Sequence, residues 1–152
     1  MNITITGHRK INHSAVQIIN FKMKELVENP EIETIYFGGA KGTDTEALLC
    51  ALSWRDELKR KNLRLIAVVP DTLKNQPKET HEISKMADEI IELKNTIMKE
   101  NKFESFKIRN HYMVDRSDKV VAFWNGQYKS GTYSAMNYAR KNKKYVEEIR
   151  VD

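Results

Sequence analysis

TIYFGGAKGTD, at residues 34–44, places a predicted strand, a glycine-rich loop and the start of a helix directly after one another. The β-branched and aromatic residues of 34–37 favour a strand, and the glycines that follow favour a loop. Thr43 is a residue type that often caps a helix N-terminus. This order of elements is typical of a βαβ unit.

The same alternation of strand and helix continues on both sides of this stretch. Towards the N-terminus, Ile3 to Thr6 predicts a strand, and Ser14 caps a helix that Asn29-Pro30 ends. Towards the C-terminus, LIAVV at 65–69 is a continuous apolar run, which suits a strand buried in a parallel sheet. The further predicted elements are helices over 44–60, 79–86, 106–116 and 132–142 and strands over 119–124 and 145–151. Residues 87–93 fit either a helix or a short strand, and 95–102 read as a mobile connector.

Length and composition agree with one globular domain over 1–152. The 152 residues are 40% hydrophobic and 31% charged, which argues against a disordered or fibrous chain. The sequence predicts an α/β fold with a mainly parallel sheet and helices on both faces. It contains no basic leader before a long apolar run and no run of eighteen apolar residues, so we expect a cytoplasmic protein. Cys50, in an apolar helical run, is expected to be structural.

Loops that follow the strands are the expected place for a ligand, because loops and helix N-termini converge at the carboxyl edge of a parallel sheet. Unusual residues occur in three of these loops, at 7–9, 38–44 and 129–132. Closely spaced glycines let backbone N–H groups approach an anion, and Thr43 adds a hydroxyl. These loops predict a site for a phosphate-bearing ligand.

Four motifs in this order resemble the SLOG superfamily: Thr6-Gly7-His8-Arg9, the loop at 38–44, Arg109-Asn110-His111-Tyr112-Met113, and Ser130-Gly131-Thr132. That superfamily joins Smf/DprA-type DNA-processing proteins, LOG phosphoribohydrolases and small YpsA- or YspA-like proteins. The chain looks nearest the YpsA-like branch. The resemblance implies a Rossmann-like three-layer sandwich whose glycine-rich loops bind nucleotides or nucleotide-derived ligands.

The resemblance to the phosphoribohydrolases is incomplete at the position that carries their chemistry. Arg109 and Met113 keep the helix spacing of that branch, but its glutamate falls on Ala135 and its leading proline is missing. Glycosidic cleavage needs a carboxylate near the ribose, which alanine cannot supply. We therefore favour binding without catalysis, with Asp44, Glu46 and Arg109 as the weak catalytic candidates.

The histidines show no paired metal-ligand spacing, so neither a metal nor a cofactor is predicted. Trp124, at the end of its strand, is a candidate for stacking on a base. The residues expected to bind the ligand are Gly7, His8, Arg9, Gly38, Gly39, Ala40, Lys41, Gly42, Thr43, Asp44, Arg109, Asn110, Trp124, Ser130, Gly131 and Thr132.

Three functions follow, in order of preference. The first is a nucleotide binder that acts as a sensor or sequesters a nucleotide signal, and the second is a nucleotide-processing hydrolase. The third, a single-stranded DNA binder, is suggested by the net charge of +5, but no basic stripe interleaved with aromatic residues supports it. We also expect a homo-oligomer, because Phe106, Tyr112 and Met113 are predicted to be exposed.

Overall fold

The protein is described by a computed structural model over residues 1–94 and 101–152. Its strands are β1 (Asn2–Gly7), β2 (Thr34–Phe37), β3 (Arg64–Val69), β4 (Glu89–Glu92), β5 (Lys119–Trp124) and β6 (Tyr145–Arg150). Its helices are α1 (His13–Glu28), α2 (Thr43–Glu57), α3 (Lys78–Ser84), α4 (Lys102–Asp115) and α5 (Gly131–Lys141), with a short 3-10 helix at Leu73–Asn75.

The strands form one sheet in the order β4-β3-β2-β1-β5-β6, and every neighbouring pair is parallel. From β1 the chain adds strands outward on one side as far as β4, and then returns to place β5 and β6 on the other side. The direction of growth therefore reverses between β1 and β5. In open α/β sheets this switch point is where a crevice opens at the carboxyl ends of the strands.

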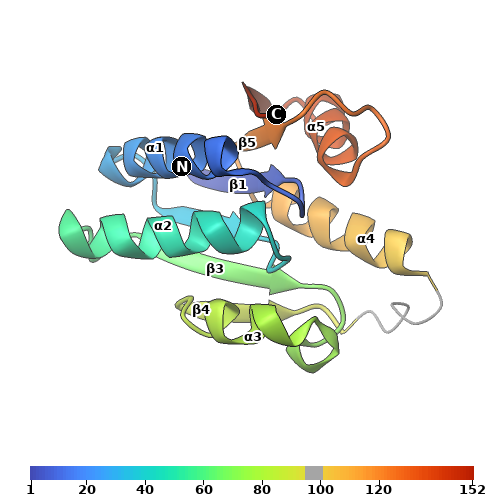
Figure 1. The fold of residues 1–152 in the computed structure, drawn as a ribbon, viewed down its shortest axis with the longest axis horizontal. Coiled ribbons are helices and arrows are strands. Elements are labelled where there is room, and N and C mark those ends of the chain that lie inside the picture. Colours follow the sequence, from blue (N-terminus) through green and yellow to red (C-terminus); the bar gives the residue numbers. More distant parts are fainter. Residues whose placement is uncertain (95–100) are drawn as a thin grey trace.

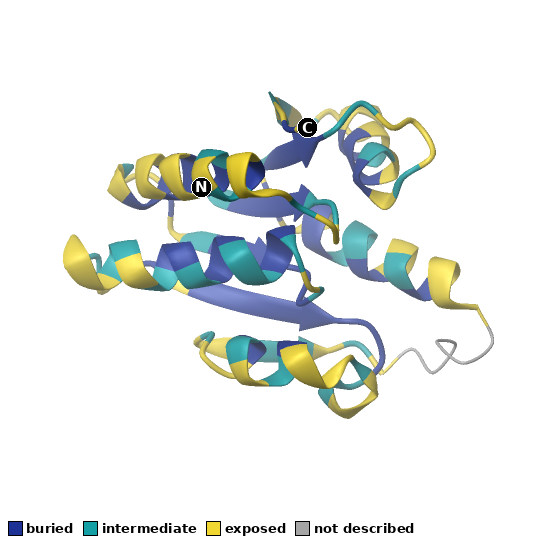
Figure 2. Cartoon of the chain, viewed as in Figure 1, coloured by how far each residue is buried: buried dark blue, intermediate teal, exposed yellow. Residues whose placement is uncertain are grey.

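Alternating side chains of the strands build a core on each face of the sheet. Ile3, Ile35 and Val121 pack with apolar residues of α1 and α2 on one face. Tyr36 and Val68 pack with Met113 of α4 on the other face, where Ala122 also packs with Met136 of α5. Figure 1 shows α1, α2 and α3 side by side over the sheet, and Figure 2 shows the buried strands beneath exposed outer helix surfaces. This is the expected three-layer sandwich.

Several element boundaries differ from the sequence-based expectation. Asn12, rather than Ser14, caps α1, since its side chain accepts a hydrogen bond of 2.8 Å from the N–H of Ala15. Helix α4 begins at Lys102, with Asn101 as its cap, a turn before the expected start. The ambiguous stretch 87–93 contains strand β4. Most of the expected connector, 95–100, lies outside the described residues.

Cys50 is buried on α2 at 8% exposure, as expected for a structural cysteine. Burial, with the nearby Glu46 carboxylate, raises the pKa of its thiol to about 12. In the described part of the chain, no helix is both long enough and apolar enough to span a membrane.

Candidate functional site

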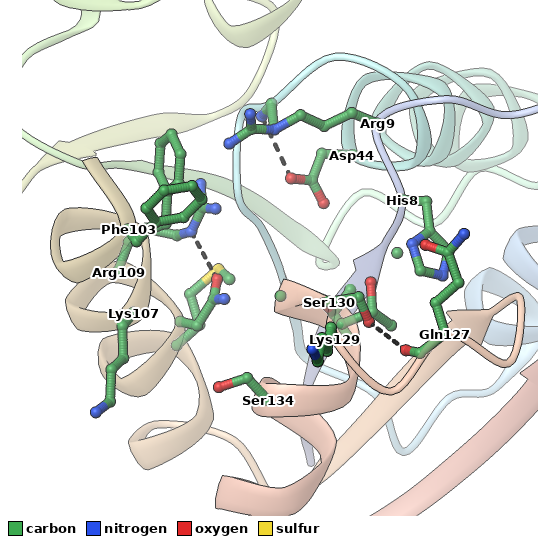
Figure 3. Close-up of a pocket in the computed structure, with 18 of the residues that line it drawn as sticks. His8, Arg9, Asp44, Phe103, Lys107, Arg109, Gln127, Lys129, Ser130 and Ser134 are labelled. Atoms are coloured by element: carbon green, nitrogen blue, oxygen red, sulfur yellow. Dashed lines mark hydrogen bonds between the residues drawn. The ribbon is translucent and has the colours of Figure 1, made fainter. Parts of the chain in front are cut away.

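A cleft of about 730 Å³ opens at the switch point between β1 and β5 (Figure 3). The segments that line it are the loop after β1, the start of α2, one side of α4, and the loop that joins β5 to α5. They come from both halves of the chain. Its volume falls in the range of about 300 to 1,000 Å³ that is common for small-molecule sites.

Ten of the expected ligand-binding residues lie together in the lining of this cleft. They are Gly7, His8, Arg9, Ala40, Asp44, Arg109, Asn110, Ser130, Gly131 and Thr132. The three loops singled out in the sequence therefore share one edge of the sheet. Gly131 begins α5, and a Cβ atom added to it would meet no atom within 4 Å, so the start of this helix faces open space.

The glycine-rich loop itself is only partly exposed to the cleft. The described lining omits Gly38, Gly39, Lys41, Gly42, Thr43 and Trp124. Gly42, with a φ of +85°, is the N-cap of α2, the place expected for Thr43, and it packs against the backbone of His8 and Arg9. Gly39, with a φ of +73°, packs against Val69. These glycines shape the loop and join it to its neighbours, because only a glycine fits such close contacts without strain.

Thr43 is also committed to contacts inside the protein. Its hydroxyl donates to the carbonyl oxygen of His8 over 2.9 Å, and its N–H donates to the same oxygen over 3.0 Å. The side chain is fully buried. The hydroxyl and N–H that the sequence suggested for a phosphate thus join α2 to the loop after β1.

Two further expected residues have structural roles. Trp124 is 7% exposed, and its Nε1–H donates to the carbonyl oxygen of Gln127 over 2.8 Å. Its ring stacks on Tyr133 of α5 with 5.3 Å between centroids, so it packs against the start of that helix. Glu46 accepts a hydrogen bond from the Cys50 thiol at 3.8 Å and is not among the described residues of the lining.

Arg109 is a buried cation at the base of the cleft. Its Nε–H donates to Asn110 Oδ1 over 2.8 Å, and its Nη1 donates to the carbonyl oxygen of Gly38. The Phe106 ring lies beside it, 5.7 Å from the Arg109 Cζ atom and 4.3 Å from that of Arg9. Two guanidinium groups from distant segments thus meet on one aromatic ring, an attractive arrangement for cations.

Asp44 is the buried carboxyl group in the lining. Its Oδ2 accepts a hydrogen bond of 3.3 Å from the N–H of Ala40. Burial raises the pKa of Asp44, while the positive charges of Arg109 and Arg9 act in the opposite direction. A carboxyl with a perturbed pKa in a cleft is a frequent mark of a functional site.

His8 lines the cleft beside the loop that follows β5. Its Nε2 accepts a hydrogen bond of 3.0 Å from the N–H of Asn125. Burial lowers the pKa of His8. Both observations describe a neutral ring whose proton is on Nδ1.

The sequence-based list missed a group of lining residues that flank the expected ones. They include Lys10, Asn101, Phe103, Glu104, Phe106, Lys107, Asn125, Gln127, Lys129 and Ser134. Phe103 is 85% exposed and lies in the lining of the cleft. Its signal in the sequence is weak, because an exposed phenylalanine at a helix start breaks no pattern. Phe106, Tyr112 and Met113 were expected to be exposed, but Met113 is buried at 2% exposure and the other two are half-buried.

The described residues contain no group of three or more His, Cys, Asp or Glu side chains that is arranged to hold a metal ion. The cleft offers instead cations, aromatic rings and a helix N-terminus, the groups that recognise anions and planar rings.

The fold and the cleft define a Rossmann-like α/β protein with a ligand-sized cleft at its topological switch point. Residues 1–150 match the family of DNA recombination-mediator protein A, and the chain belongs to that family. This confirms the resemblance to the SLOG superfamily on its DNA-processing side, and nearness to the YpsA-like branch stays a prediction.

One relative by sequence and one solved structure are each similar to most of the chain. The chain is 33% identical over 135 residues to an uncharacterized SPbeta prophage-derived protein, YoqJ, of Bacillus subtilis (strain 168), a match that covers 78% of this chain and 76% of that protein. The DNA processing protein A of Streptococcus pneumoniae superposes with a TM-score of 0.73 at 18% identity, over 97% of this chain and 49% of that one.

Two other solved structures share the fold. That of DNA processing protein A from Helicobacter pylori, described for its single-stranded DNA binding mode, has a TM-score of 0.71 at 23% identity, over 97% of this chain and 64% of that one. A structural-genomics target, TM1055, has a TM-score of 0.61 at 15% identity, over 95% of this chain and 71% of that one. The chain thus spans about half to two thirds of the DNA processing proteins it matches.

Proposed function

We propose that the cleft binds single-stranded DNA. The observation that carries this proposal is the combination of cations and aromatic rings around one opening: Arg9, Lys10, Lys107, Arg109 and Lys129 with Phe103 and Phe106. Proteins that bind single strands pair a positively charged groove with aromatic side chains on which bases stack. The family assignment and the single-stranded DNA binding named for the Helicobacter pylori relative support the same ligand.

This order of preference differs from that suggested by the sequence, where a nucleotide binder came first. The hydroxyl and N–H of Thr43 are used within the protein, which weakens the case for a phosphate cradle in the glycine-rich loop. The sequence has no continuous basic and aromatic stripe, but basic and aromatic residues from separate segments line the same cleft. The basic residues among them come from three segments of the chain. Charge in this cleft favours a polyanion.

The test is the salt dependence of binding to a labelled oligothymidylate, followed by fluorescence anisotropy. Lys107→Gln and Lys129→Gln should each weaken binding and lower the slope of log K against log salt by about 0.7, the loss of one phosphate contact on a single strand. Lys61→Gln is the matched control, because Lys61 is exposed and is not among the described residues of the cleft. No binding by the wild-type chain, or an equal effect of Lys61→Gln, would reject the proposal.

A nucleotide-sized ligand is the second candidate, favoured by the volume of the cleft, about 730 Å³, and by the open start of α5 at Gly131. Mass spectrometry of small molecules released from the purified protein tests it. Any ligand found there can be incubated with the protein, and its recovery intact or cleaved separates binding from cleavage. Of the two acidic candidates for cleavage, Asp44 lines the cleft and Glu46 does not. A cytoplasmic location and self-association remain predictions, the latter tested by light scattering.

A further inference from the structure

Asp44 holds an unusual position for an acidic residue in a cleft that attracts anions. The residue is 8% exposed and yet contributes to the lining. Among the described residues, no lysine or arginine nitrogen lies within the 4.0 Å of an ion pair with its carboxylate. A buried carboxylate without a direct ionic partner is costly to keep charged.

The positive charge of Arg109 acts on Asp44 without forming an ion pair with it. If Gly38 carried a Cβ atom, that atom would lie 2.6 Å from Asp44 Oδ2 and 2.8 Å from Arg109 Nη1. The carboxylate of Asp44 and the guanidinium of Arg109 therefore lie on the same side of Gly38, in the space that a side chain at this position would occupy. The guanidinium also donates a hydrogen bond to the carbonyl oxygen of Gly38. Figure 3 shows Arg9, Asp44 and Arg109, which enter this part of the cleft from the loop after β1, from α2 and from α4.

We propose that Asp44 is a built-in counter-ion of the cleft, and that a phosphate group which binds beside Arg9 and Arg109 is accompanied by uptake of one proton by Asp44. The proton comes from solvent and adds to a carboxylate oxygen, and no other bond changes. A phosphate and a carboxylate repel each other where water is scarce, whereas a protonated carboxyl can donate a hydrogen bond to the phosphate. This inference rests on the proposed function.

The electrostatics of the free cleft support such a coupling. Burial raises the pKa of Asp44, and four weaker effects oppose that rise: the charge of Arg109, hydrogen bonds from the backbone of Ala40 and Gly38, and the charge of Arg9. A phosphate that neutralises the two arginines removes the part of this opposition that comes from charge. Burial then favours the neutral form of the carboxyl group, which takes up a proton.

Other charged groups around the cleft define the controls. The described lining contributes His8, Arg9 and Lys10 after β1, Glu104, Lys107 and Arg109 on α4, and Lys129 before α5. On the helix of Asp44, Glu46 is paired with the Cys50 thiol. His8 is the other group whose titration would alter DNA binding, because its protonation adds a positive charge at the site.

The experiment measures the affinity for an oligothymidylate between about pH 5 and 8 at constant ionic strength, for wild type, Asp44→Asn and His8→Gln. Wild-type affinity should fall by up to about tenfold per pH unit where one proton is taken up. His8→Gln should keep the part of this dependence that Asp44 causes, and Asp44→Asn should keep only the part that His8 causes. Calorimetry of the wild type in buffers of different ionisation enthalpy should show uptake of close to one proton, independently of any variant.

The outcomes separate the coupling from the function. Binding by the wild type with no proton uptake would overturn the coupling alone. Loss of all binding in a folded Asp44→Asn would also overturn it, since Asp44 would then accept a hydrogen bond from the ligand. No binding by the wild type at any pH would overturn both the function and the coupling.

Discussion

The backbone N–H of Asn125 donates a hydrogen bond to Nε2 of His8 over 3.0 Å, which joins the loop after β5 to the loop after β1. An imidazole nitrogen that accepts a hydrogen bond carries no proton. A protonated His8 could not keep this contact. The lowered pKa that burial gives His8 agrees with the geometry.

We therefore expect the free energy of unfolding to decrease as the pH falls below 6.5, the ordinary pKa of histidine. The contribution of His8 is full above that pH. Below it, the unfolded chain binds a proton that the folded chain does not, until the pH passes the lowered pKa of the folded state. Urea denaturation at about pH 7.5 and pH 5.5 measures the change, which His8→Gln should reduce.

Some pH dependence should remain in His8→Gln, because burial also lowers the pKa of His111, as does the neighbouring Lys107. An undiminished dependence in the variant would show that the contact with Asn125 does not hold His8 neutral. Circular dichroism at pH 7.5 confirms that the variant is folded.

Phe103→Ala should weaken binding of single-stranded DNA by roughly 1 to 3 kcal/mol, the contribution of one stacked base. The side chain is 85% exposed, so its removal should leave thermal stability nearly unchanged. Phe21→Ala is the matched control, because Phe21 on α1 is 80% exposed and is not part of the described cleft. Equal affinities of the two variants would argue against stacking on Phe103.

Gly131→Val should preserve the fold and weaken binding by about 1.4 kcal/mol or more, a tenfold loss. Its side chain would project into open space at the start of α5, where a ligand would otherwise approach the backbone. Gly39→Ala should instead destabilise the fold, by about 1 to 3 kcal/mol. Its φ is +73°, and the new Cβ atom would lie 2.8 Å from Val69 Cγ1. Thermal melts and binding isotherms of both variants distinguish the two roles.

Cys50 should resist alkylation in the folded protein. A pKa of about 12 leaves roughly a thousandfold less thiolate than the ordinary value of 9.0, and the thiolate is the species that reacts. A time course with iodoacetamide, followed by mass spectrometry with and without denaturant, should show fast labelling only after unfolding. Comparable rates in the two conditions would mean that the helix around Cys50 opens readily.

The parts of the fold that could be predicted are those where local chemistry and tertiary structure agree. The side chains at 65–69 are all apolar, so a strand formed by them needs protein on both faces of the sheet. This pattern indicated a buried strand in a parallel sheet. The stretch at 87–93 was ambiguous because β4 lies at the edge of the sheet and its residues are half-buried or exposed. An edge strand shows no clear apolar period.

The candidate site was predicted in outline, and its details depended on contacts between distant segments. Loop position in the sequence grouped Gly7, Ala40 and Ser130 together, and all three line the cleft. Nothing near Thr43 in sequence shows that the His8 carbonyl uses its hydroxyl. The basic and aromatic character of the cleft was hidden for the same reason, since Arg9 and Phe106 meet only in the folded chain.

The central position of β1 has a consequence for the order in which the protein assembles. Ile3 pairs with Ile35 on one side and with Lys119 on the other. During synthesis, β1 can acquire its first partner early, but its second edge stays unpaired until β5 has left the ribosome. We infer that the nascent chain exposes an apolar strand edge until β5 is available, and that this edge favours aggregation in the meantime.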